Sequence, residues 1–280
     1  MTRLSGKVAM VTGSGGEHGL GRAIARRLAA EGADLVLTDI APGGTRVLAT
    51  RPAGAWGGLE AVAAEVRTTG RHAMTALLDI RCANRVNGVI AQALERFGRI
   101  DILVNNAAAP PGADRVPVVD LSEEAWDAVL DVNLKGSFLC AKAVATVMLR
   151  QKIRGRIINI ASDRGKFGSA NLAAYCASKF GLIGFTQALA QELAAARVTV
   201  NAVCPGGLDT ERLDYLGKRE DGGYDPALRA ERVRQLAAKV PLGRFTTVND
   251  VAELVAFLAS DEAEIITGQA INVSGGTIMH

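Results

Sequence analysis

Two side chains that could move a proton stand one helical turn apart in the segment "AAYCASKFG". Tyr175 and Lys179 are four positions apart on a predicted helix, so both project from the same helix face. A phenol, with a reference pKa of about 10, is a poor base at neutral pH, but a nearby ammonium favours the phenolate. Such a pair can take a proton from an alcohol or return one to a carbonyl. The two could equally be ordinary helix residues, so the pair needs support from the rest of the chain.

A glycine-rich turn near the start of the chain offers a second piece of chemistry. In "KVAMVTGSGGEHGLGRAIA" a strand pattern runs into glycines and then into a helix pattern, an arrangement that holds a pyrophosphate at a helix N-terminus. Asp39 ends the following strand pattern, where a carboxylate accepts hydrogen bonds from the adenosine ribose hydroxyls and repels a 2′-phosphate. No arginine directly follows Asp39, so NAD is predicted rather than NADP. The alternative is that Asp39 is a solvated residue at a strand end.

Strand and helix patterns alternate along almost the whole chain, as in proteins with a parallel sheet covered by helices. Strands are predicted at 7–13, 33–40, 72–80, 100–108, 155–162, 198–206 and 269–276, and helices at 21–32, 58–70, 83–98, from about Ser122, 173–195 and 248–260. We therefore expect one α/β domain over residues 1–280, with a Rossmann-like, doubly wound sheet of seven parallel strands. Two stretches interrupt the alternation, a long connection at 41–58 and a charged, variable segment at 211–245. Both follow strand ends at the edge where such sheets bind ligands.

Composition excludes several other classes of protein. Of the 280 residues 49% are hydrophobic and the net charge is only +3, with no basic block, so no nucleic-acid partner is expected. No run of 18 apolar residues predicts a membrane span, and the first apolar run leads straight into the glycine turn, which does not resemble a signal peptide. Cys82, Cys140, Cys176 and Cys204 are scattered without a metal or redox motif, so no metal and a cytoplasmic location are expected.

Further motifs surround the Tyr175–Lys179 pair in a fixed order. "NNAA" follows one strand pattern, "VNLKG" supplies Asn133, "NIASDRG" places Ser162 at a strand end, and "VNAVCPGGLDT" follows the tyrosine helix. Together with the glycine turn, this set closely resembles the single-domain branch of the short-chain dehydrogenase/reductase family. The resemblance runs from Lys7 to Gly276, and the combination of motifs is highly specific.

The resemblance implies roles for four catalytic residues. Tyr175 would be the general acid/base, Lys179 would support it and bind the nicotinamide ribose, and Ser162 would hydrogen-bond the reacting oxygen. Asn133 would hold a water that links Lys179 to solvent. The implied reaction is reversible hydride transfer between a secondary alcohol or ketone and nicotinamide, in which the protein positions and protonates.

The resemblance also implies a set of cofactor-binding residues and an oligomeric state. Ala108 stands where the family usually has glycine, and its methyl group is not expected to abolish binding. A homotetramer is implied by the family alone. The residues expected to bind NAD are Gly13, Gly19, Leu20, Asp39, Ile40, Asp79, Ile80, Asn106, Ala107, Tyr175, Lys179, Pro205, Gly206, Leu208 and Thr210.

The glycines of the first turn can be counted in two ways. Gly15 to Gly21 matches the family's common G-x-x-x-G-x-G spacing, whereas a turn that starts at Gly13 and ends with Gly19-Leu20-Gly21 is two residues longer. A strand ending at Thr12 has the family's usual length, so we expect the turn to start at Gly13 and to contain a two-residue insertion. The insertion would carry Glu17 and His18 close to the nucleotide, with His18 on a phosphate or ribose, or it would bulge outward and touch nothing.

The substrate pocket should draw on the variable parts of the chain, namely residues 109–114, Arg164, Lys166, Asn171 and 211–245. Candidate substrates are secondary alcohols of sugars, cyclic alcohols, hydroxysteroids and hydroxyacyl thioesters. Arg164, two residues past Ser162, could meet an anionic or polyhydroxylated substrate, or with Lys166 it could belong to a solvated loop. The connection at 41–58 loosely resembles insertions in family members that retain their cofactor tightly.

Two other functions compete with an NAD-dependent dehydrogenase. The first is an NADPH-dependent 3-oxoacyl-type ketoreductase, against which Asp39 argues because of its charge. The second is a catalytically idle nucleotide-binding regulator, against which the complete set of Asn133, Ser162, Tyr175 and Lys179 argues.

Overall fold

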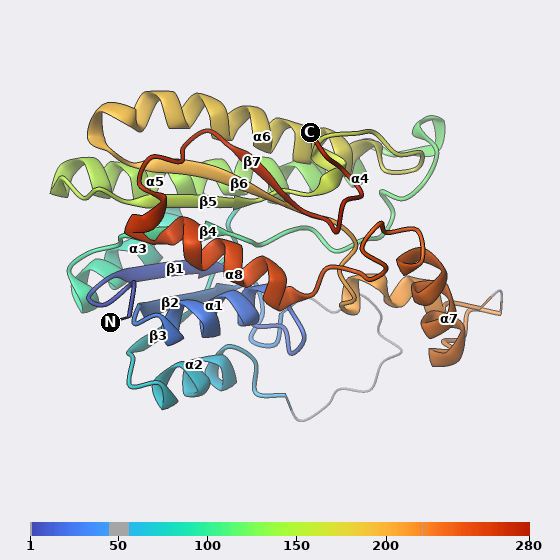
Figure 1. Ribbon diagram of the computed structural model, residues 1–280, viewed down its shortest axis with the longest axis horizontal. Helices are drawn as coiled ribbons and strands as arrows, with labels where there is room; N and C mark the ends of the chain where they lie inside the picture. Colours follow the sequence, from blue (N-terminus) through green and yellow to red (C-terminus); the bar gives the residue numbers. More distant parts are fainter. Residues whose placement is uncertain (1, 45–55, 220) are drawn as a thin grey trace.

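The computed structural model describes residues 2–44, 56–219 and 221–280 and contains one parallel sheet (Figure 1). Its seven strands lie in the order β3-β2-β1-β4-β5-β6-β7, which confirms the predicted Rossmann-like, doubly wound class. The order reverses between β1 and β4, and ligands bind outside the carboxyl ends of the strands at such a point. The strands are β1 (Val8–Thr12), β2 (Asp34–Asp39), β3 (Ala73–Leu77), β4 (Ile102–Asn105), β5 (Arg156–Ile160), β6 (Thr199–Pro205) and β7 (Ala270–Val273).

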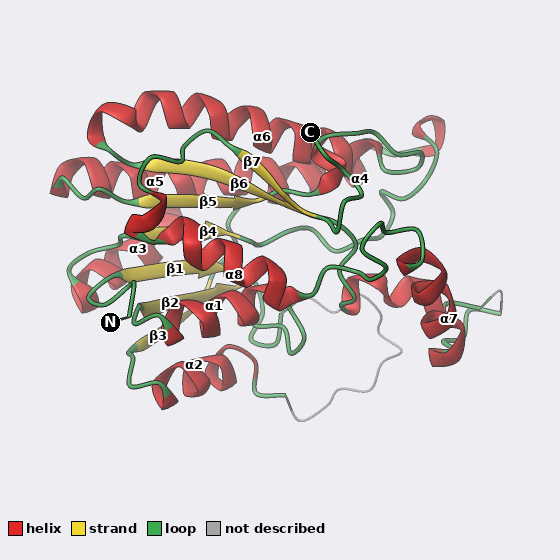
Figure 2. Cartoon of the chain, in the orientation of Figure 1, coloured by secondary structure: helices red, strands yellow, loops and turns green. Residues whose placement is uncertain are grey.

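Helices cover both faces of this sheet (Figure 2). One hydrophobic core joins the sheet to α1 (Leu20–Ala30), α2 (Gly58–Thr68) and α8 (Val248–Ala259). The other core joins it to α3 (Ala83–Phe97), α5 (Ser137–Gln151) and α6 (Ala173–Leu193). Because both faces are covered, the central strands read as continuous apolar runs such as "VAMVT" in β1, in which every residue is buried.

The helix expected from Ser122 onward is interrupted, which the sequence did not predict. Ser122 does cap it, since its Oγ accepts a hydrogen bond from the Ala125 backbone N–H at 3.2 Å. The helix then divides into α4 (Glu123–Leu130), a π-helical segment (Asp131–Gly136) and α5. Such π segments occur frequently at functional sites, and this one carries Asn133, whose side chain is buried.

The combined stretch Glu123–Gln151 is long and apolar enough to cross a membrane by length and composition alone, with a hydropathy of 1.3. Half of its most apolar window is nevertheless buried inside the fold. Cys140, Val144 and Met148 of α5 pack into the second core. This stretch therefore has the contacts of a core helix.

The variable segment contains a helix that the sequence pattern did not reveal. After a 3₁₀ segment, η5 (Glu211–Gly217), the chain forms α7 (Pro226–Ala237), which projects at the right of Figure 1. Asp225 caps α7, accepting hydrogen bonds from the backbone N–H groups of Ala227 and Leu228 at 2.8 and 3.2 Å. No residue of α7 is buried, so it lacks the apolar stripe that reveals a helix in a sequence. Most of the 41–58 connection lies outside the described residues.

Candidate active site

Tyr175, Lys179 and Ser162 meet at the carboxyl edge of the sheet. Tyr175 and Lys179 share one face of α6, and the Lys179 Nζ lies 5.8 Å from the centre of the Tyr175 ring. The same Nζ donates a hydrogen bond to the carbonyl oxygen of Ile160, at the end of β5, at 2.8 Å. Ser162 follows two residues later, and its Oγ donates to Asp163 Oδ1 at 3.0 Å. The bond to Ile160 thus ties α6 to the strand end that carries Ser162.

The ammonium of Lys179 is almost completely removed from water, since the residue is 3% exposed. Burial lowers the pKa of Lys179 to about 7, and the neighbouring positive charge of Arg212 lowers it further. A strongly shifted group in a cleft is typical of a functional site. Its protonation near neutral pH is therefore set by the site itself.

Asn133 connects the loop after β4 to α6. Its Oδ1 accepts a hydrogen bond from the Ala109 backbone N–H at 2.8 Å, and its Nδ2 donates to Ser178 Oγ at 3.0 Å. Ser178 in turn donates to the carbonyl oxygen of Tyr175 at 2.7 Å. Asn133 thereby positions the helix turn that carries Tyr175. Its expected role in holding a water near Lys179 stays a prediction.

The glycine turn starts where the strand-length argument placed it. β1 ends at Thr12, and Gly13 has a φ of +69°, in the left-handed region that favours glycine. A Cβ on Gly21 would overlap the carbonyl oxygen of Gly13 and lie 2.7 Å from Asn106 Nδ2. The turn therefore opens at Gly13 and closes at Gly21, with Gly19 preceding the first residue of α1.

The N-terminus of α1 fits a bound pyrophosphate. Gly19 provides no side chain to cap the first turn of the helix, so within the described residues its early N–H groups lack a side-chain acceptor. Such a terminus binds an anionic group through its backbone N–H groups and the helix dipole. The residues present thus fit a dinucleotide at this turn.

Asp39 lies beside the same turn at the end of β2 and is 8% exposed. Its Oδ2 accepts a hydrogen bond from the Gly15 backbone N–H at 2.9 Å, and its Oδ1 accepts one from the Ile40 backbone N–H at 2.8 Å. Burial raises the pKa of Asp39, while these backbone N–H groups act in the opposite direction. The Ala41 backbone N–H acts on the carboxylate as well, and because a carboxylate has about four acceptor sites, one stays for a ribose hydroxyl.

Residues of the long connection and of α1 pack on the turn from outside. Trp56 Nε1 donates a hydrogen bond to the carbonyl oxygen of Gly15 at 2.7 Å, and the Arg22 guanidinium lies 4.7 Å from the centre of the Trp56 ring. Arg22 also donates to the carbonyl oxygen of Glu17. The side chains of Glu17 and His18 are 44% and 52% exposed, so both reach solvent. Trp56 is a contact of the turn that the sequence did not suggest.

Three more of the expected cofactor residues are engaged within the chain. Asp79 forms an ion pair with Arg81, with 2.8 Å between Oδ2 and Nη2. Asn106 Nδ2 donates to the carbonyl oxygens of Thr12 and Gly13, both at 2.9 Å, and so holds the turn in place. Ala107 is held similarly, since its backbone N–H donates to Thr12 Oγ1 at 3.0 Å.

The remaining expected cofactor residues lie along the same edge of the sheet. Ile80 is buried and Ile40 is half exposed. Gly206 follows β6 and donates its N–H to the carbonyl oxygen of Val273 at 3.0 Å. Leu208 pairs with Thr246 in an isolated bridge, and Thr210 is buried directly before η5. Their direct contacts with a nucleotide stay predictions.

The structure adds Arg212 to the site, a residue that sequence reasoning included only within the variable segment. Arg212 lies on η5, and its charge acts on both Lys179 and Tyr175. Arg115, from the loop after β4, stacks on Tyr215 of η5 with 4.7 Å between guanidinium and ring centre. This contact joins the two variable segments beside the catalytic residues. The two segments are about a hundred positions apart in the sequence, so their contact could not be predicted from local patterns.

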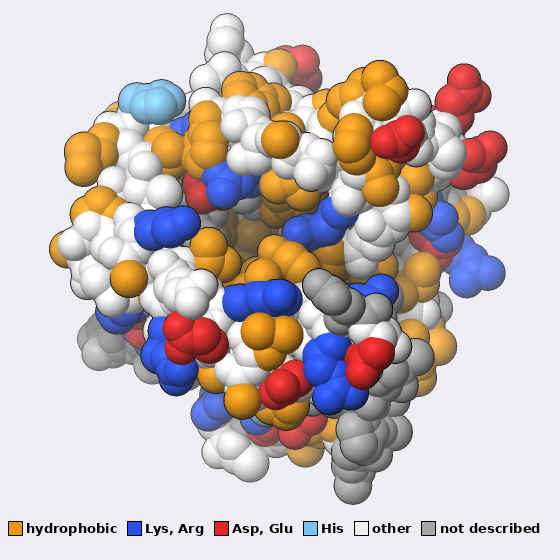
Figure 3. Space-filling model, turned by 90° about the vertical axis from the view of Figure 1, so that its right-hand side faces the viewer, with side chains coloured by type: hydrophobic (Ala, Val, Ile, Leu, Met, Phe, Trp, Pro, Cys, Tyr) orange, Lys and Arg blue, Asp and Glu red, His pale blue; other side chains and the backbone are white. Residues whose placement is uncertain are grey.

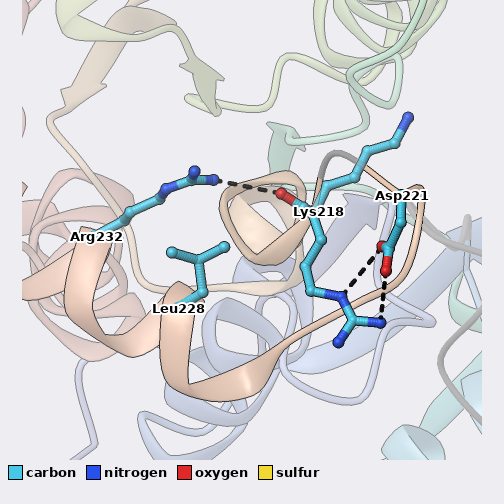
Figure 4. A pocket seen from close by; sticks show the side chains of 5 residues that line it. Lys218, Asp221, Leu228 and Arg232 are labelled. Atoms are coloured by element: carbon cyan, nitrogen blue, oxygen red, sulfur yellow. Dashed lines mark hydrogen bonds and ion pairs between the residues drawn. The ribbon is translucent and has the colours of Figure 1, made fainter.

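The molecular surface is hollowed at the carboxyl edge of the sheet, as expected for a binding site. Figure 3 shows a hollow with an apolar floor and several Lys and Arg side chains on its rim. A second, open depression lies beside α7 and is lined by Lys218, Arg219, Asp221, Leu228 and Arg232 (Figure 4). In the described part of the chain, no three His, Cys, Asp or Glu side chains gather to hold a metal ion.

Fold and site together define a nucleotide-dependent oxidoreductase that acts on CH–OH groups. The family described as enoyl-(acyl carrier protein) reductase matches residues 13–278. The chain belongs to the short-chain dehydrogenase/reductase family.

Similar proteins cover the whole length of the chain. A 3-oxoacyl-[acyl-carrier-protein] reductase of Synechocystis is 40% identical over 281 aligned residues, which cover 100% of both chains. A sorbitol dehydrogenase of Cereibacter sphaeroides is 35% identical and covers 99% of each chain. The crystal structure of an NAD⁺-bound xylitol dehydrogenase is 32% identical, with a TM-score of 0.84, and the alignment covers 98% of this chain and 100% of that one.

Proposed function

We propose that this protein is a single-domain, NAD-dependent dehydrogenase that oxidises a secondary alcohol and reduces the corresponding ketone. The observation that carries the choice of NAD is the buried carboxylate of Asp39 beside the glycine turn. A fixed negative charge there repels a 2′-phosphate, whereas the acceptor site that the backbone leaves on the carboxylate suits a ribose hydroxyl. Similarity to an NAD⁺-bound xylitol dehydrogenase supports the same cofactor.

Tyr175, Lys179 and Ser162 each have a separate role in the proposed reaction. The Tyr175 hydroxyl takes the proton of the substrate alcohol, and returns it in the reverse direction. Lys179, held by the Ile160 carbonyl, keeps an ammonium near the phenolate that forms. The Ser162 hydroxyl now donates to Asp163 Oδ1. When substrate binds, rotation of this hydroxyl lets it donate to the reacting oxygen instead. When bound, NAD supplies the acceptor for the hydride.

Steady-state kinetics with each nucleotide test this proposal. With a panel of secondary alcohols, we expect the wild-type protein to reduce NAD with a kcat/KM at least roughly tenfold above that for NADP, since one hydrogen bond to a charged group contributes about 1.5–3 kcal/mol. Asp39→Asn should lower the ratio of kcat/KM for NAD to that for NADP, because it removes the negative charge that repels the 2′-phosphate of NADP. Asp127→Asn, on the exposed face of α4, is the matched control and should leave the ratio unchanged. A wild-type preference for NADP would contradict the proposal.

A second candidate is an NADPH-dependent 3-oxoacyl ketoreductase, which is favoured by the similarity to the Synechocystis reductase. The same nucleotide comparison separates it from the first, and turnover of a 3-oxoacyl thioester would identify its substrate. Tight NAD binding without turnover of any alcohol or ketone would instead favour a regulator.

A further inference from the structure

The guanidinium of Arg212 has an unusual position for a cation without a partner. Arg212 is partly buried on η5 and lies among Tyr175, Arg115 and Asp114, whose charges act on it. Within the described residues it makes no hydrogen bond and no ion pair. Other arginines of the variable segment are paired, as Arg229 is with Asp214 at 2.9 Å. A half-buried charge without a partner is costly, so Arg212 is poised to bind an anion.

Arg115 lies near Arg212 and also has a guanidinium nitrogen without a hydrogen-bond partner among the described residues. Its guanidinium stacks on Tyr215 at 4.7 Å, but its Nε is buried and has no hydrogen-bond partner in the described structure. Stacking on an aromatic ring leaves the edge of a guanidinium free to bind a carboxylate or phosphate. Arg115 therefore keeps such an edge for an anion, next to Arg212, on which Tyr175 also acts.

Two arginines and two acidic side chains lie around the catalytic residues. Asp163 is engaged by the Ser162 hydroxyl at 3.0 Å, and Asp114 is the acidic side chain that acts on Arg212 among those described. One oxygen of Asp114 already accepts the Gly112 backbone N–H at 2.9 Å. Both acidic side chains thus have contacts of their own, and the two guanidinium groups match a substrate that brings a negative charge.

Of the cations that the sequence suggested for this purpose, Lys166 has partners in the chain, since its Nζ donates to the carbonyl oxygens of Ala270 and His280 at 2.7 and 2.6 Å. Arg164 stacks on a ring as Arg115 does, 4.2 Å from the centre of Phe167, but within the described residues it has no buried nitrogen that lacks a hydrogen-bond partner. Both arginines of the depression in Figure 4 are also engaged, since Arg219 pairs with Asp221 and Arg232 donates to the carbonyl oxygen of Leu216.

We propose that Arg212 and Arg115 bind an anionic oxygen group, a carboxylate or a phosphate, on the substrate whose alcohol or ketone faces Tyr175. Planar guanidinium groups bind both kinds of anion with two parallel hydrogen bonds. This inference rests on the proposed oxidoreductase function and narrows its substrate class to hydroxy and keto acids or their phosphorylated counterparts. Arg212 and Arg115 are then the residues that select for charge.

Binding to a protein that cannot turn over tests this inference separately from the activity. The host is Tyr175→Phe saturated with NADH, and calorimetry measures the Kd of matched pairs of probes. One pair is oxopentanoate and its methyl ester, and the other is fructose phosphate and fructose. We expect the anionic member of at least one pair to bind more tightly. Adding Arg212→Gln should weaken only that member, roughly ten- to a hundredfold, the range for hydrogen bonds to a charged group.

Three further variants sharpen the result. Arg212→Lys keeps the charge and should recover part of the binding, whereas Arg115→Gln should weaken it in the same sense as Arg212→Gln. Arg150→Gln removes one exposed charge from the far end of α5 and should change nothing. Equal binding of both members in each pair, or an equal loss for both in Arg212→Gln, would overturn the inference. Turnover of neutral alcohols by the wild-type protein would then leave the proposed function standing.

Discussion

The Nζ of Lys179 lies 5.8 Å from the centre of the Tyr175 ring while it donates a hydrogen bond to the carbonyl oxygen of Ile160 at 2.8 Å. The ammonium is therefore fixed between the helix that carries the tyrosine and the strand end that precedes Ser162.

Removal of the tyrosine hydroxyl should abolish most of the turnover without unfolding the protein. Tyr175→Phe keeps the ring but loses the proton donor and acceptor, and general acid–base catalysis contributes about 10²–10⁴-fold. We expect kcat to fall within this range and the affinity for NAD to stay close to the wild-type value. Tyr224→Phe, in the variable segment, is the control and should keep its activity. A Tyr175→Phe protein with nearly full kcat would exclude Tyr175 as the acid/base.

The stability of the nucleotide-free protein should depend on pH through Lys179. Its pKa falls from 10.5 to about 7 on folding, so between these values the unfolded chain binds more protons than the folded one. Stability attributable to this residue is then lowest below pH 7 and rises as the pH increases toward 10.5. Thermal melts of wild type and Lys179→Met from pH 7 to 10 isolate this contribution. We expect the wild-type Tm to rise relative to the variant, and parallel curves would show that Lys179 is not shifted.

Asn133 should stabilise the site through its two partners. Asn133→Ala leaves the buried Ala109 N–H without an acceptor, which costs about 1–3 kcal/mol. Ser178→Ala removes the other partner. Because the two side chains share a hydrogen bond of 3.0 Å, urea unfolding of the single and double variants should give a coupling of about 0.5–3 kcal/mol. Strictly additive losses would show that this bond contributes nothing.

Two glycine-to-alanine changes should have opposite effects. In Gly21→Ala the new methyl group would overlap the Gly13 carbonyl, and overpacking of this kind costs about 1–3 kcal/mol. NAD binding should weaken as well, because the turn must open. Gly88→Ala is the matched control, since a Cβ there meets nothing within 4 Å on the exposed side of α3. It should stabilise the protein by about 0.5–1 kcal/mol. Equal effects on urea unfolding would mean that Gly21 and Gly13 do not touch.

Trp56 should report on the nucleotide. Its indole hydrogen bond to Gly15 places it against the turn, whereas Trp126 lies on α4. Titration with NAD should change the intrinsic fluorescence of wild type and Trp126→Phe, because bound nucleotide alters the surroundings of Trp56. The change should be lost in Trp56→Phe. Retention of the full signal in that variant would place the nucleotide elsewhere.

Local patterns were sufficient to predict the class of fold and the family. Continuous apolar runs such as β1 indicate strands buried on both faces, and the order of motifs around Ser162 and Tyr175 identifies the family. Boundaries were less well predicted. The helix from Ser122 is interrupted by a π-helical segment, which leaves no regular mark on the pattern of buried residues. The helix α7 has no buried residue and so no apolar stripe, and hydrophobic periodicity detects a helix only through its buried face.

The sequence by itself determined that this chain forms a doubly wound sheet, with Asp39 at the end of a strand and Tyr175 and Lys179 one turn apart on a helix. Only the tertiary structure decided which other side chains join them. Arg212 and Arg115 come together through a ring contact between loops far apart in the chain, and Trp56 reaches Gly15 across a long connection. The physical reason is that loops have no repeating pattern, so their side chains are placed by contacts across the fold rather than by their neighbours in sequence.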